Sequence, residues 1–533
     1  MISRGHLAKA GRPFFYFHRA RGCRLRERAL VHLHIFKFPF IIIDMPDSIF
    51  NYGGTAFVLI ALPALGIIAK FLGVSFQRLV KWYCYVAVFA VVVVVNSIFF
   101  PFIGGKDYFF RYAVELGLIA WLLWWAFEAK ADEVKHLIKA TFKKPLVLAV
   151  TAFVAAVQLA AIFALDAHAA FWSNYERGEG GFQMLHYYIF FLLLVMLFQH
   201  EEDWKRIFKF SLVAAGAMIG YGILANLGYA NFIGPYTGGT VPTGVWRLLT
   251  NGRFEGTLGN PAYVAPYLMF SIFFAAYLWC ASRISGKLTA LKSWGYGVLI
   301  AAFLFFFYLS QTRGAFLGLV AGVFIGVLYL AFAGPRIVRR WSLISIGILV
   351  VLALGVFAIR NEPFLNNIPG GRLLQISVTD ASAQTRFWVW GEAWKGFLQR
   401  PIFGWGSENF TAVYDKFFNP QFFVPGTSTE TWFDRAHSVF FDYLVETGIV
   451  GFLSYLSIFI VFAREFFRRK PATAGNAHER KTAQVIQNGL MLAMPVAYLV
   501  QGVAIFDVLP MYIPLFLFLG FATFYFKKPA MTN

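Results

Sequence analysis

Residues 434–463 read DRAHSVFFDYLVETGIVGFLSYLSIFIVFA, and the change of character inside this stretch decides the fold. Its first five residues, Asp434-Arg435-Ala436-His437-Ser438, end a long polar segment, whereas the remainder is apolar enough for a membrane helix. Cationic and titratable groups therefore lie where a membrane span begins. Charge at a bilayer boundary is tolerated when it reaches water or has a function. We therefore expect functional residues at this boundary.

The composition is that of an integral membrane protein. Of the 533 residues, 59% are hydrophobic and only 14% are charged, and apolar runs of membrane length recur along the chain. These runs predict an all-α integral membrane fold with about 12–13 transmembrane helices. The expected spans are 54–73, 82–103, 110–127, 145–165, 184–199, 207–227, 262–282, 293–309, 314–333, 342–359, 438–463, 485–507 and 508–526.

The net charge of +20 reflects membrane topology rather than a nucleic-acid partner. The basic residues gather in short loops that alternate along the chain, as the positive-inside rule requires of cytoplasmic loops. These residues are Lys130, Lys135, Lys139, Lys143, Lys144, Lys205, Arg206, Lys209, Arg283, Lys287, Lys292, Arg336, Arg339, Arg340, Arg464, Arg468, Arg469, Lys470, Arg480 and Lys481. We therefore predict no nucleic-acid partner, and we expect the remaining loops to face the other side of the membrane.

The spans and loops divide the chain into five parts. They are a basic N-terminal tail at 1–53, transmembrane helices at 54–359, a large outer loop at 360–437, C-terminal transmembrane helices at 438–526 and a cytoplasmic tail at 527–533. If 54–73 crosses the membrane, the alternation leaves the basic tail outside, against the charge rule. Either 54–73 does not cross fully, or translation begins at Met45. We expect a chain that starts at Met45 to insert and function normally.

Residues 386–398 of the large loop have the spacing of an amphipathic helix. Arg386, Trp390, Trp394 and Phe397 fall on one helical face, and such an aromatic-rich helix should lie in the outer membrane interface. A single tryptophan at this position is also explained as an interface anchor without a further role.

No metal or cofactor is predicted. Cys23, Cys84 and Cys280 have neither the spacing of metal ligands nor that of a disulfide framework. The 10 histidines are scattered, and no outer cluster has ligand spacing.

Four polar residues stand out among the outer loops. Arg253 lies in a Gly-rich stretch just before a span, and Arg313 ends a turn so short that its guanidinium is held at a helix start. His437 begins the span after the large loop, and Arg177 lies in the outer loop 166–183. Guanidinium groups at helix starts suit the oxygens of a pyrophosphate, which also bind free helix N–H groups. Each arginine alone is also explained as a snorkelling residue that binds any lipid phosphate.

These groups fit the transfer of a sugar from a pyrophosphate-linked lipid. The leaving pyrophosphate gains negative charge in such a transfer, and fixed cations that stabilise this charge lower the barrier. His437 would then act as the base that takes a proton from the acceptor hydroxyl, because imidazole titrates near neutral pH. A hydrogen-bonded structural histidine is the competing interpretation.

Several strings of this sequence resemble the O-antigen ligase and polymerase superfamily of bacterial membrane glycosyltransferases. The pattern His437-Ser438, nine residues, Gly448, two residues, Gly451 is similar to that of the ligases. The turn at 310–315 resembles their Ser/Thr-Arg-Gly turn, and Arg253 to Pro261, including Asn260, resembles their Arg-x-x-Gly-x-x-x-Asn-Pro pattern. The loop segment from Trp390 to Phe410, with Pro401, Gly404, Trp405, Gly406 and Asn409, is also similar. The likeness extends over roughly residues 80–526.

The resemblance implies an all-α, GT-C-like fold and a metal-independent, inverting glycosyltransferase. The donor would be an undecaprenyl-pyrophosphate-linked glycan, the acceptor lipid A-core, and the site the periplasmic face of the inner membrane, among membrane lipids. Arg253 and Arg313 would bind pyrophosphate, with Arg435, Arg177 and Asn260 as further substrate-binding candidates and His437 as the catalytic base.

Three other functions stay open at this point. Within the superfamily, repeat-unit polymerases and protein O-oligosaccharyltransferases use other acceptors, and Arg360, ten residues, Gly371 also fits a polymerase pattern. Outside it, a lipid-linked glycan transporter would also have many helices and cationic groups. A transporter predicts charges through the bundle interior and internal pseudo-symmetry. The sequence shows neither clearly, so we favour the ligase.

Overall fold

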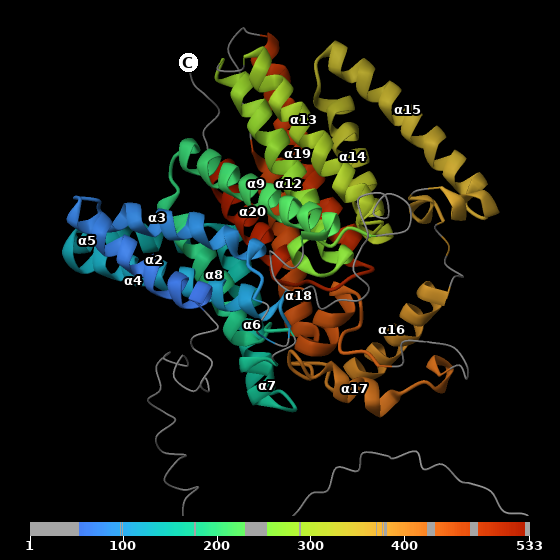
Figure 1. Ribbon diagram of the computed structural model, residues 1–533, viewed down its shortest axis with the longest axis horizontal. Coiled ribbons are helices and arrows are strands. Elements are labelled where there is room, and N and C mark those ends of the chain that lie inside the picture. The colour runs from blue at the N-terminus through green and yellow to red at the C-terminus, as the bar shows by residue number, and fades with distance from the viewer. Residues whose placement is uncertain are drawn as a thin grey trace, which may run out of the picture. The chain divides into compact units, whose positions relative to one another are not determined.

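The apolar runs form helices in the computed structural model of the chain (Figure 1). The structure describes residues 53–527 except 96–97, 99, 175–176, 230–252, 287–288, 369, 376, 378–380, 424–431 and 470–477. The basic N-terminal tail and Met45 lie outside the described residues, and the fold below concerns the compact unit of residues 57–533.

Every regular element of the described residues is helical. The main helices are α2 Gly53–Phe71, α3 Phe76–Ala87, α4 Gly104–Phe127, α5 Ala131–Phe142, α6 Pro145–Ile162, α7 Ala167–Trp172, α8 Gly181–Leu197, α9 Glu201–Leu224, α12 Pro261–Ile284, α13 Ala290–Leu309, α14 Arg313–Ala333, α15 Arg336–Ile359, α16 Ala381–Gln399, α17 Phe410–Phe417, α18 Val439–Arg468, α19 His478–Gly502 and α20 Leu509–Lys527. The short elements are η3 Val88–Val92, η4 Ala225–Tyr229, η5 Gly256–Leu258, η6 Pro363–Asn367, η7 Gly371–Leu373 and η8 Pro420–Phe422.

The expected all-α membrane fold is confirmed. In the described part of the chain, 10 helices are long and apolar enough to cross a membrane, and two shorter apolar helices, Ile60–Phe71 and Gly181–Leu197, accompany them. The expected span 82–103 is not one helix, because α3 starts earlier, at Phe76, and regular structure ends at Val92. The β-branched run 91–95 disfavours a helix, and the N–H of Val95 instead donates to the carbonyl of Pro101.

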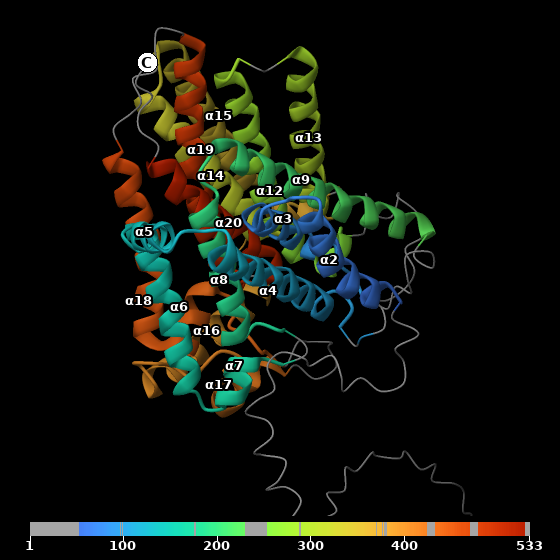
Figure 2. The ribbon, with the colours of Figure 1, turned by 90° about the vertical axis from the view of Figure 1, so that its left-hand side faces the viewer.

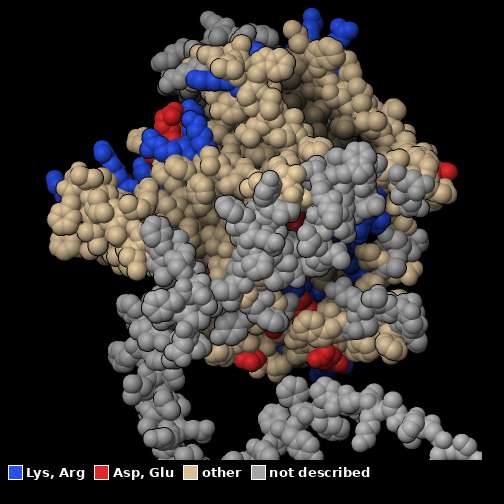
Figure 3. All heavy atoms as spheres, in the orientation of Figure 1, with Lys and Arg blue, Asp and Glu red and all other residues tan. Residues whose placement is uncertain are grey.

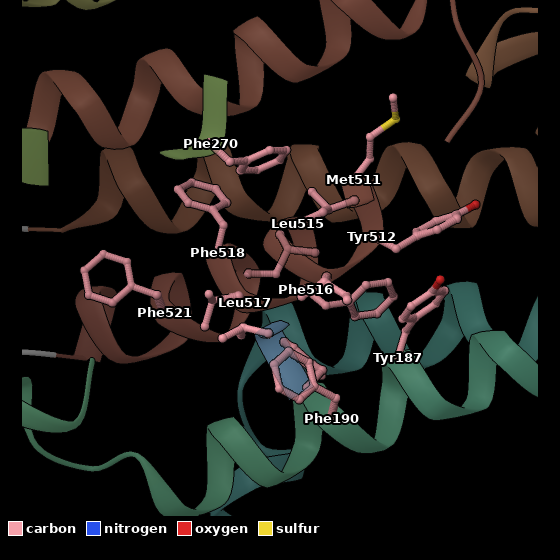
Figure 4. Packing of buried hydrophobic residues seen from close by; sticks show 14 of the residues in the cluster. Tyr187, Phe190, Phe270, Met511, Tyr512, Leu515, Phe516, Leu517, Phe518 and Phe521 are labelled. Atoms are coloured by element: carbon pink, nitrogen blue, oxygen red, sulfur yellow. The ribbon is translucent and has the colours of Figure 1, made fainter. Parts of the chain in front are cut away.

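Helix α20 lies in the centre of the bundle. In its apolar window 89% of the residues are buried, and it packs against α8, α12, α6 and α18. Figure 4 shows Tyr512 and Phe516 of α20 facing Tyr187 of α8, with ring centroids 4.8 and 5.8 Å from that of Tyr187. A helix that is apolar on all sides can be enclosed by other helices without burying a polar face.

Helices α14 and α19 approach each other closely through small residues. A Cβ atom on Gly318 would lie 2.5 Å from the carbonyl oxygen of Ala497, and one on Gly322 would lie 2.7 Å from that of Ala493. Stripes of small residues of this kind let membrane helices pack backbone to backbone. The contact fixes the start of α14 against the end of α19.

The helix ends form two chemically different ends of the bundle. Helices α7, α16 and α17 lie together at one end in both views (Figures 1 and 2), which we call the loop end. The opposite end, which we call the basic end, has Arg283, Arg336 and Arg468 at the ends of α12, α15 and α18. Lys and Arg side chains gather at the upper margin of the molecule in Figure 3, as the loop alternation predicts.

The large loop folds back onto the start of α18. The expected helix at 386–398 is observed as α16, and Trp390 on it donates from Nε1 to the carbonyl of Ala436 at 3.0 Å. The same ring stacks on Phe441 with centroids 5.3 Å apart. One turn further along α16, Trp394 is 48% exposed, so its position in the membrane interface stays a prediction.

Two glycines let the loop interlock with a break in α18. Gly448 has φ 63° and ψ −167° inside α18, and the N–H groups of Trp405 and Gly406 donate to the freed carbonyls of Val445 and Glu446 at 2.9 and 2.8 Å. A Cβ atom on Gly404 would lie 2.4 Å from the backbone of Glu446, so both positions need glycine. The two glycine patterns noted in the sequence therefore form one joint.

Candidate functional site

The turn between α13 and α14 holds Arg313 at the loop end. Helix α13 ends at Leu309, Gln311 adopts a left-handed backbone with φ 50°, and Arg313 is the first residue of α14. The Nε–H of Arg313 donates to the carbonyl of Arg372 at 2.9 Å. The turn predicted from 310–313 therefore presents its guanidinium to η7 in the large loop.

Arg253 lies beside the same turn. Its Nε–H donates to the carbonyl of Ser310 at 2.9 Å, and its terminal nitrogen Nη2 donates to the hydroxyl of Thr312 at 3.3 Å. The next residue, Phe254, donates its backbone N–H to Leu309 at 3.0 Å, so the Arg253 segment runs along the end of α13. The acceptors in these bonds are neutral and do not cancel the guanidinium charge.

Arg253, Arg313 and Arg372 together form what we call the arginine cluster. Burial, followed by the nearby Arg372 guanidinium, lowers the pKa of Arg253 from 12.5 to about 10, and Arg313 adds to the shift. Glu255 opposes it without cancelling it. The local field is therefore positive, which suits a polyanionic group.

His437 lies at the start of α18 in a strained backbone conformation. Its φ is 55°, which a residue with a side chain adopts at a cost and often at a functional site. Its Nδ1–H donates to the carbonyl of Arg435 at 3.1 Å, which leaves Nε2 of the neutral imidazole as the proton acceptor. The rings of Phe433 and Phe506 meet the imidazole edge to face, at 5.3 and 5.1 Å.

The surroundings keep His437 neutral. Burial lowers its pKa below 6.5, and the cations Arg386 and Arg177 act in the same direction. The carbonyl of Arg435 and the carboxylate of Asp434 oppose this shift without reversing it. A half-buried imidazole of this kind remains a base at neutral pH.

Arg435 is engaged with two carboxylates. It is 6% exposed and donates to Glu446 on α18 and Glu408 just before α17. Burial alone would lower the pKa of Arg435, but these carboxylates outweigh burial and hold it above its usual value. This geometry favours a role in positioning His437, two residues away, over direct contact with a substrate.

Arg177 lies next to His437 through a bidentate ion pair. It donates to both carboxylate oxygens of Asp434, at 2.5 and 3.0 Å, and to the hydroxyl of Tyr263 at 3.1 Å. Its guanidinium also lies 5.0 Å from the ring centroid of Phe506. Arg177 therefore joins α12 to the segment that carries His437.

Asn260 caps α12. Its side-chain oxygen accepts the N–H of Ala262 at 2.8 Å, and Pro261 follows as the first helical residue. The carbonyl of Pro261 accepts the Thr312 hydroxyl at 3.0 Å, which ties this cap to the arginine cluster. The structure thus gives Asn260 a capping role.

The turn between α19 and α20 connects the arginine cluster to His437. A Cβ atom on Gly314, next to Arg313, would lie 3.3 Å from the Cβ of Ala504. The N–H of Val439 donates to the carbonyl of Ile505 at 3.0 Å, and Phe506 contacts the His437 ring. Residues 504–506 therefore touch both segments, and His437 lies at the same end of the bundle as the arginines.

Sequence reasoning did not single out Arg372, Glu408, Glu446 or Phe506. For Arg372 a weak signal existed, because it directly follows Gly371 of the polymerase-like spacing in an outer loop. For the two carboxylates and Phe506 only the tertiary fold brings distant segments to Arg435 and His437. In the described ranges, no group of three or more His, Cys, Asp or Glu residues is arranged to hold a metal ion.

Two comparisons with known proteins bear on this arrangement. The family model described as O-antigen ligase matches residues 298–456, a range that contains Arg313, Arg372 and His437. The O-antigen ligase of Salmonella typhimurium (strain LT2) is 28% identical over 187 residues. That alignment covers 34% of this chain and 43% of the relative, so it spans less than half of the length of the relative.

Proposed function

We propose that this chain, as a member of the O-antigen ligase superfamily, transfers a glycan from undecaprenyl pyrophosphate to lipid A-core. The transfer would take place on the periplasmic face of the inner membrane, with the loop end outward and the basic end in the cytoplasm. One observation carries the proposal. A neutral histidine whose Nε2 has no hydrogen-bond partner among the described residues lies at the same end of the bundle as the arginine cluster, and residues 504–506 join the two.

Each group has a defined part in the proposed reaction. The acceptor hydroxyl oxygen attacks the anomeric carbon while its proton passes to Nε2 of His437. The bond between the anomeric carbon and the pyrophosphate oxygen breaks on the opposite face, which inverts the configuration. The released pyrophosphate keeps the electron pair, and the guanidinium groups of Arg253 and Arg313 stabilise its charge.

The histidine and the arginines have separable effects in this mechanism. His437→Ala should lower transfer by about 10²–10⁴-fold, the usual contribution of a general base, while donor binding is retained. Arg253→Ala and Arg313→Ala should weaken donor binding as well as transfer. The measurement is transfer from a lipid-linked donor to lipid A-core by the purified full chain in detergent, together with donor binding at equilibrium.

Two outcomes of that measurement would reject the proposal. Full transfer by His437→Ala would remove the base from the mechanism. Movement of the donor across a reconstituted membrane, with donor and acceptor chemically unchanged, would indicate a transporter. EDTA in every reaction tests whether transfer needs a metal ion.

The position of Arg372 gives a repeat-unit polymerase as the second candidate. The polymerase-like spacing from Arg360 to Gly371 ends next to Arg372, which belongs to the arginine cluster. Gene deletion and staining of the lipopolysaccharide separate the candidates. Loss of all polymer from lipid A-core, with polymer accumulating on its lipid carrier, indicates a ligase. A single attached repeat unit indicates a polymerase, and unchanged lipopolysaccharide indicates another acceptor, as for a protein O-oligosaccharyltransferase.

A further inference from the structure

An apolar groove lies at the basic end, far along the helices from the arginine cluster. Its volume is about 390 Å³, within the range of small-molecule pockets. It is lined by the last turns of α12 and the first turns of α15 and α19, together with Ile300 of α13. Its lining is apolar apart from Arg283 and Thr482, and neither Arg253, Arg313 nor His437 borders it.

The walls of the groove are open to the outside of the bundle. Helix α15 is the least enclosed candidate span, with 6% of its apolar window buried, and α13 follows with 11%. Ile337 on the α15 wall is 60% exposed, whereas Ala483 on the floor is buried. The groove is therefore a lateral opening between membrane helices rather than an enclosed core cavity. In a bilayer such an opening admits a hydrocarbon chain.

Among the described lining residues, the one charged side chain lies where a lipid headgroup would be. Arg283 is in the last turn of α12, and Arg336 precedes Ile337 at the start of α15. Both belong to the basic end, where the bundle carries a concentration of cations. Guanidinium groups bind phosphate oxygens through paired hydrogen bonds, and basic residues at a membrane surface attract anionic lipids.

We propose that this groove binds one acyl chain of an anionic glycerophospholipid, with the lipid phosphate at Arg283. The apolar lining accounts for the chain, and Arg283 at the end of the groove accounts for the headgroup. The lipid comes from the leaflet at the basic end, so the site differs in position and ligand from the proposed transfer site. A lipid held here bridges α12, α13, α15 and α19, and it stabilises the exposed helices α13 and α15.

The test is lipid retention by the full-length protein. Protein in detergent is incubated with phosphatidylglycerol, phosphatidylethanolamine or glycerol 3-phosphate, and bound molecules are counted by native mass spectrometry. We expect one phosphatidylglycerol to be retained at least 10-fold more tightly than phosphatidylethanolamine, and no retention of glycerol 3-phosphate.

Arg283→Gln should abolish the preference for the anionic lipid. The matched control Arg78→Gln removes an exposed arginine on α3 that does not line the groove, and it should leave the preference intact.

A second substitution tests the groove itself. Ala276→Phe places a ring in the groove from a half-buried position of α12 and should displace the acyl chain of either lipid. Ile486→Trp, on α19, fills the same space if the first variant does not fold. Equal retention of both lipids by the unaltered protein would overturn the proposal. The proposal would also be overturned if Arg283→Gln kept the preference for phosphatidylglycerol, or if both groove-filling variants retained lipid as the unaltered protein does. Binding of glycerol 3-phosphate as tightly as phosphatidylglycerol would overturn it as well.

Discussion

Two sets of arginines lie at the same end of this protein and are built in opposite ways. Arg253 donates to a backbone carbonyl and a hydroxyl, and Arg313 donates, among its contacts, to the backbone carbonyl of Arg372. Arg435 and Arg177 instead donate to carboxylates from other segments, Glu408 and Glu446 in one case and Asp434 in the other. A neutral acceptor fixes the geometry of a guanidinium without compensating its positive charge, whereas a carboxylate neutralises that charge locally.

The difference separates a substrate-binding role from a structural role. A site that must attract a polyanion needs net positive potential, and the guanidinium groups of Arg372 and Arg313 add to the burial that lowers the pKa of Arg253. A strained histidine needs a rigid support, and the buried ion pairs of Arg435 hold the segment just before it. Identical side chains therefore have different roles because of their acceptors.

The largest expected effect concerns Arg435. Arg435→Met leaves Glu408 and Glu446 buried without a cation, and removal of one partner of a buried pair costs about 3–5 kcal/mol. We expect a marked fall in the free energy of unfolding, measured by thermal unfolding in detergent. The triple variant Arg435→Met, Glu408→Gln, Glu446→Gln is the control and should recover much of the loss. A stable Arg435→Met variant with normal donor binding would contradict the structural role of Arg435.

Arg313→Lys is expected to have the next largest effect. Charge is kept, but an ammonium cannot form the paired hydrogen bonds of a guanidinium fork. Hydrogen bonds to charged groups are worth about 1.5–3 kcal/mol, which corresponds to a loss of transfer of about 10–100-fold. Initial rates of transfer measure the effect, with thermal unfolding unchanged. Wild-type turnover would make Arg313 a snorkelling residue, and Arg372→Gln tests in the same assay whether the third member of the cluster contributes.

A smaller effect is expected at Asn260. Because its side chain caps α12, Asn260→Ala should lower the free energy of unfolding by about 1 kcal/mol. Asn260→Asp keeps the capping oxygen and serves as the matched control for stability. Transfer per folded molecule should be nearly unchanged in the Ala variant. A large loss of donor affinity without a loss of stability would instead assign Asn260 to substrate binding.

The smallest expected effect is a displaced pH profile. His437 accepts a proton only when neutral, and its lowered pKa extends the neutral form to more acidic pH. In the pH profile of kcat/KM, the acid limb should therefore lie below pH 6.5. Activity should be lost as the pH falls through the lowered pKa of His437. Arg386→Gln removes a nearby cation and should move that limb to higher pH. An acid limb at or above 6.5 in the unaltered protein would contradict the structure around His437.

The sequence alone determined the membrane fold and the residues that meet at one end. Runs of apolar residues fix helices because a bilayer leaves few other backbone structures, and alternating basic loops fix which ends lie together. Arg253, Arg313 and His437 could be chosen because they remain after that topology is accounted for. The broken span at 82–103 was missed because apolarity does not report where β-branched residues end a helix.

Only the tertiary structure decided what each polar residue contacts. Glu408 and Glu446 reach Arg435 because a loop joint at Gly404 meets the break at Gly448, and no local pattern encodes that meeting. The sequence therefore predicts Arg435 as a substrate-binding residue, whereas in the fold it lies in a buried ion pair. The physical reason is that hydropathy is a property of each segment, whereas the acceptor of a hydrogen bond depends on which distant segment lies beside it.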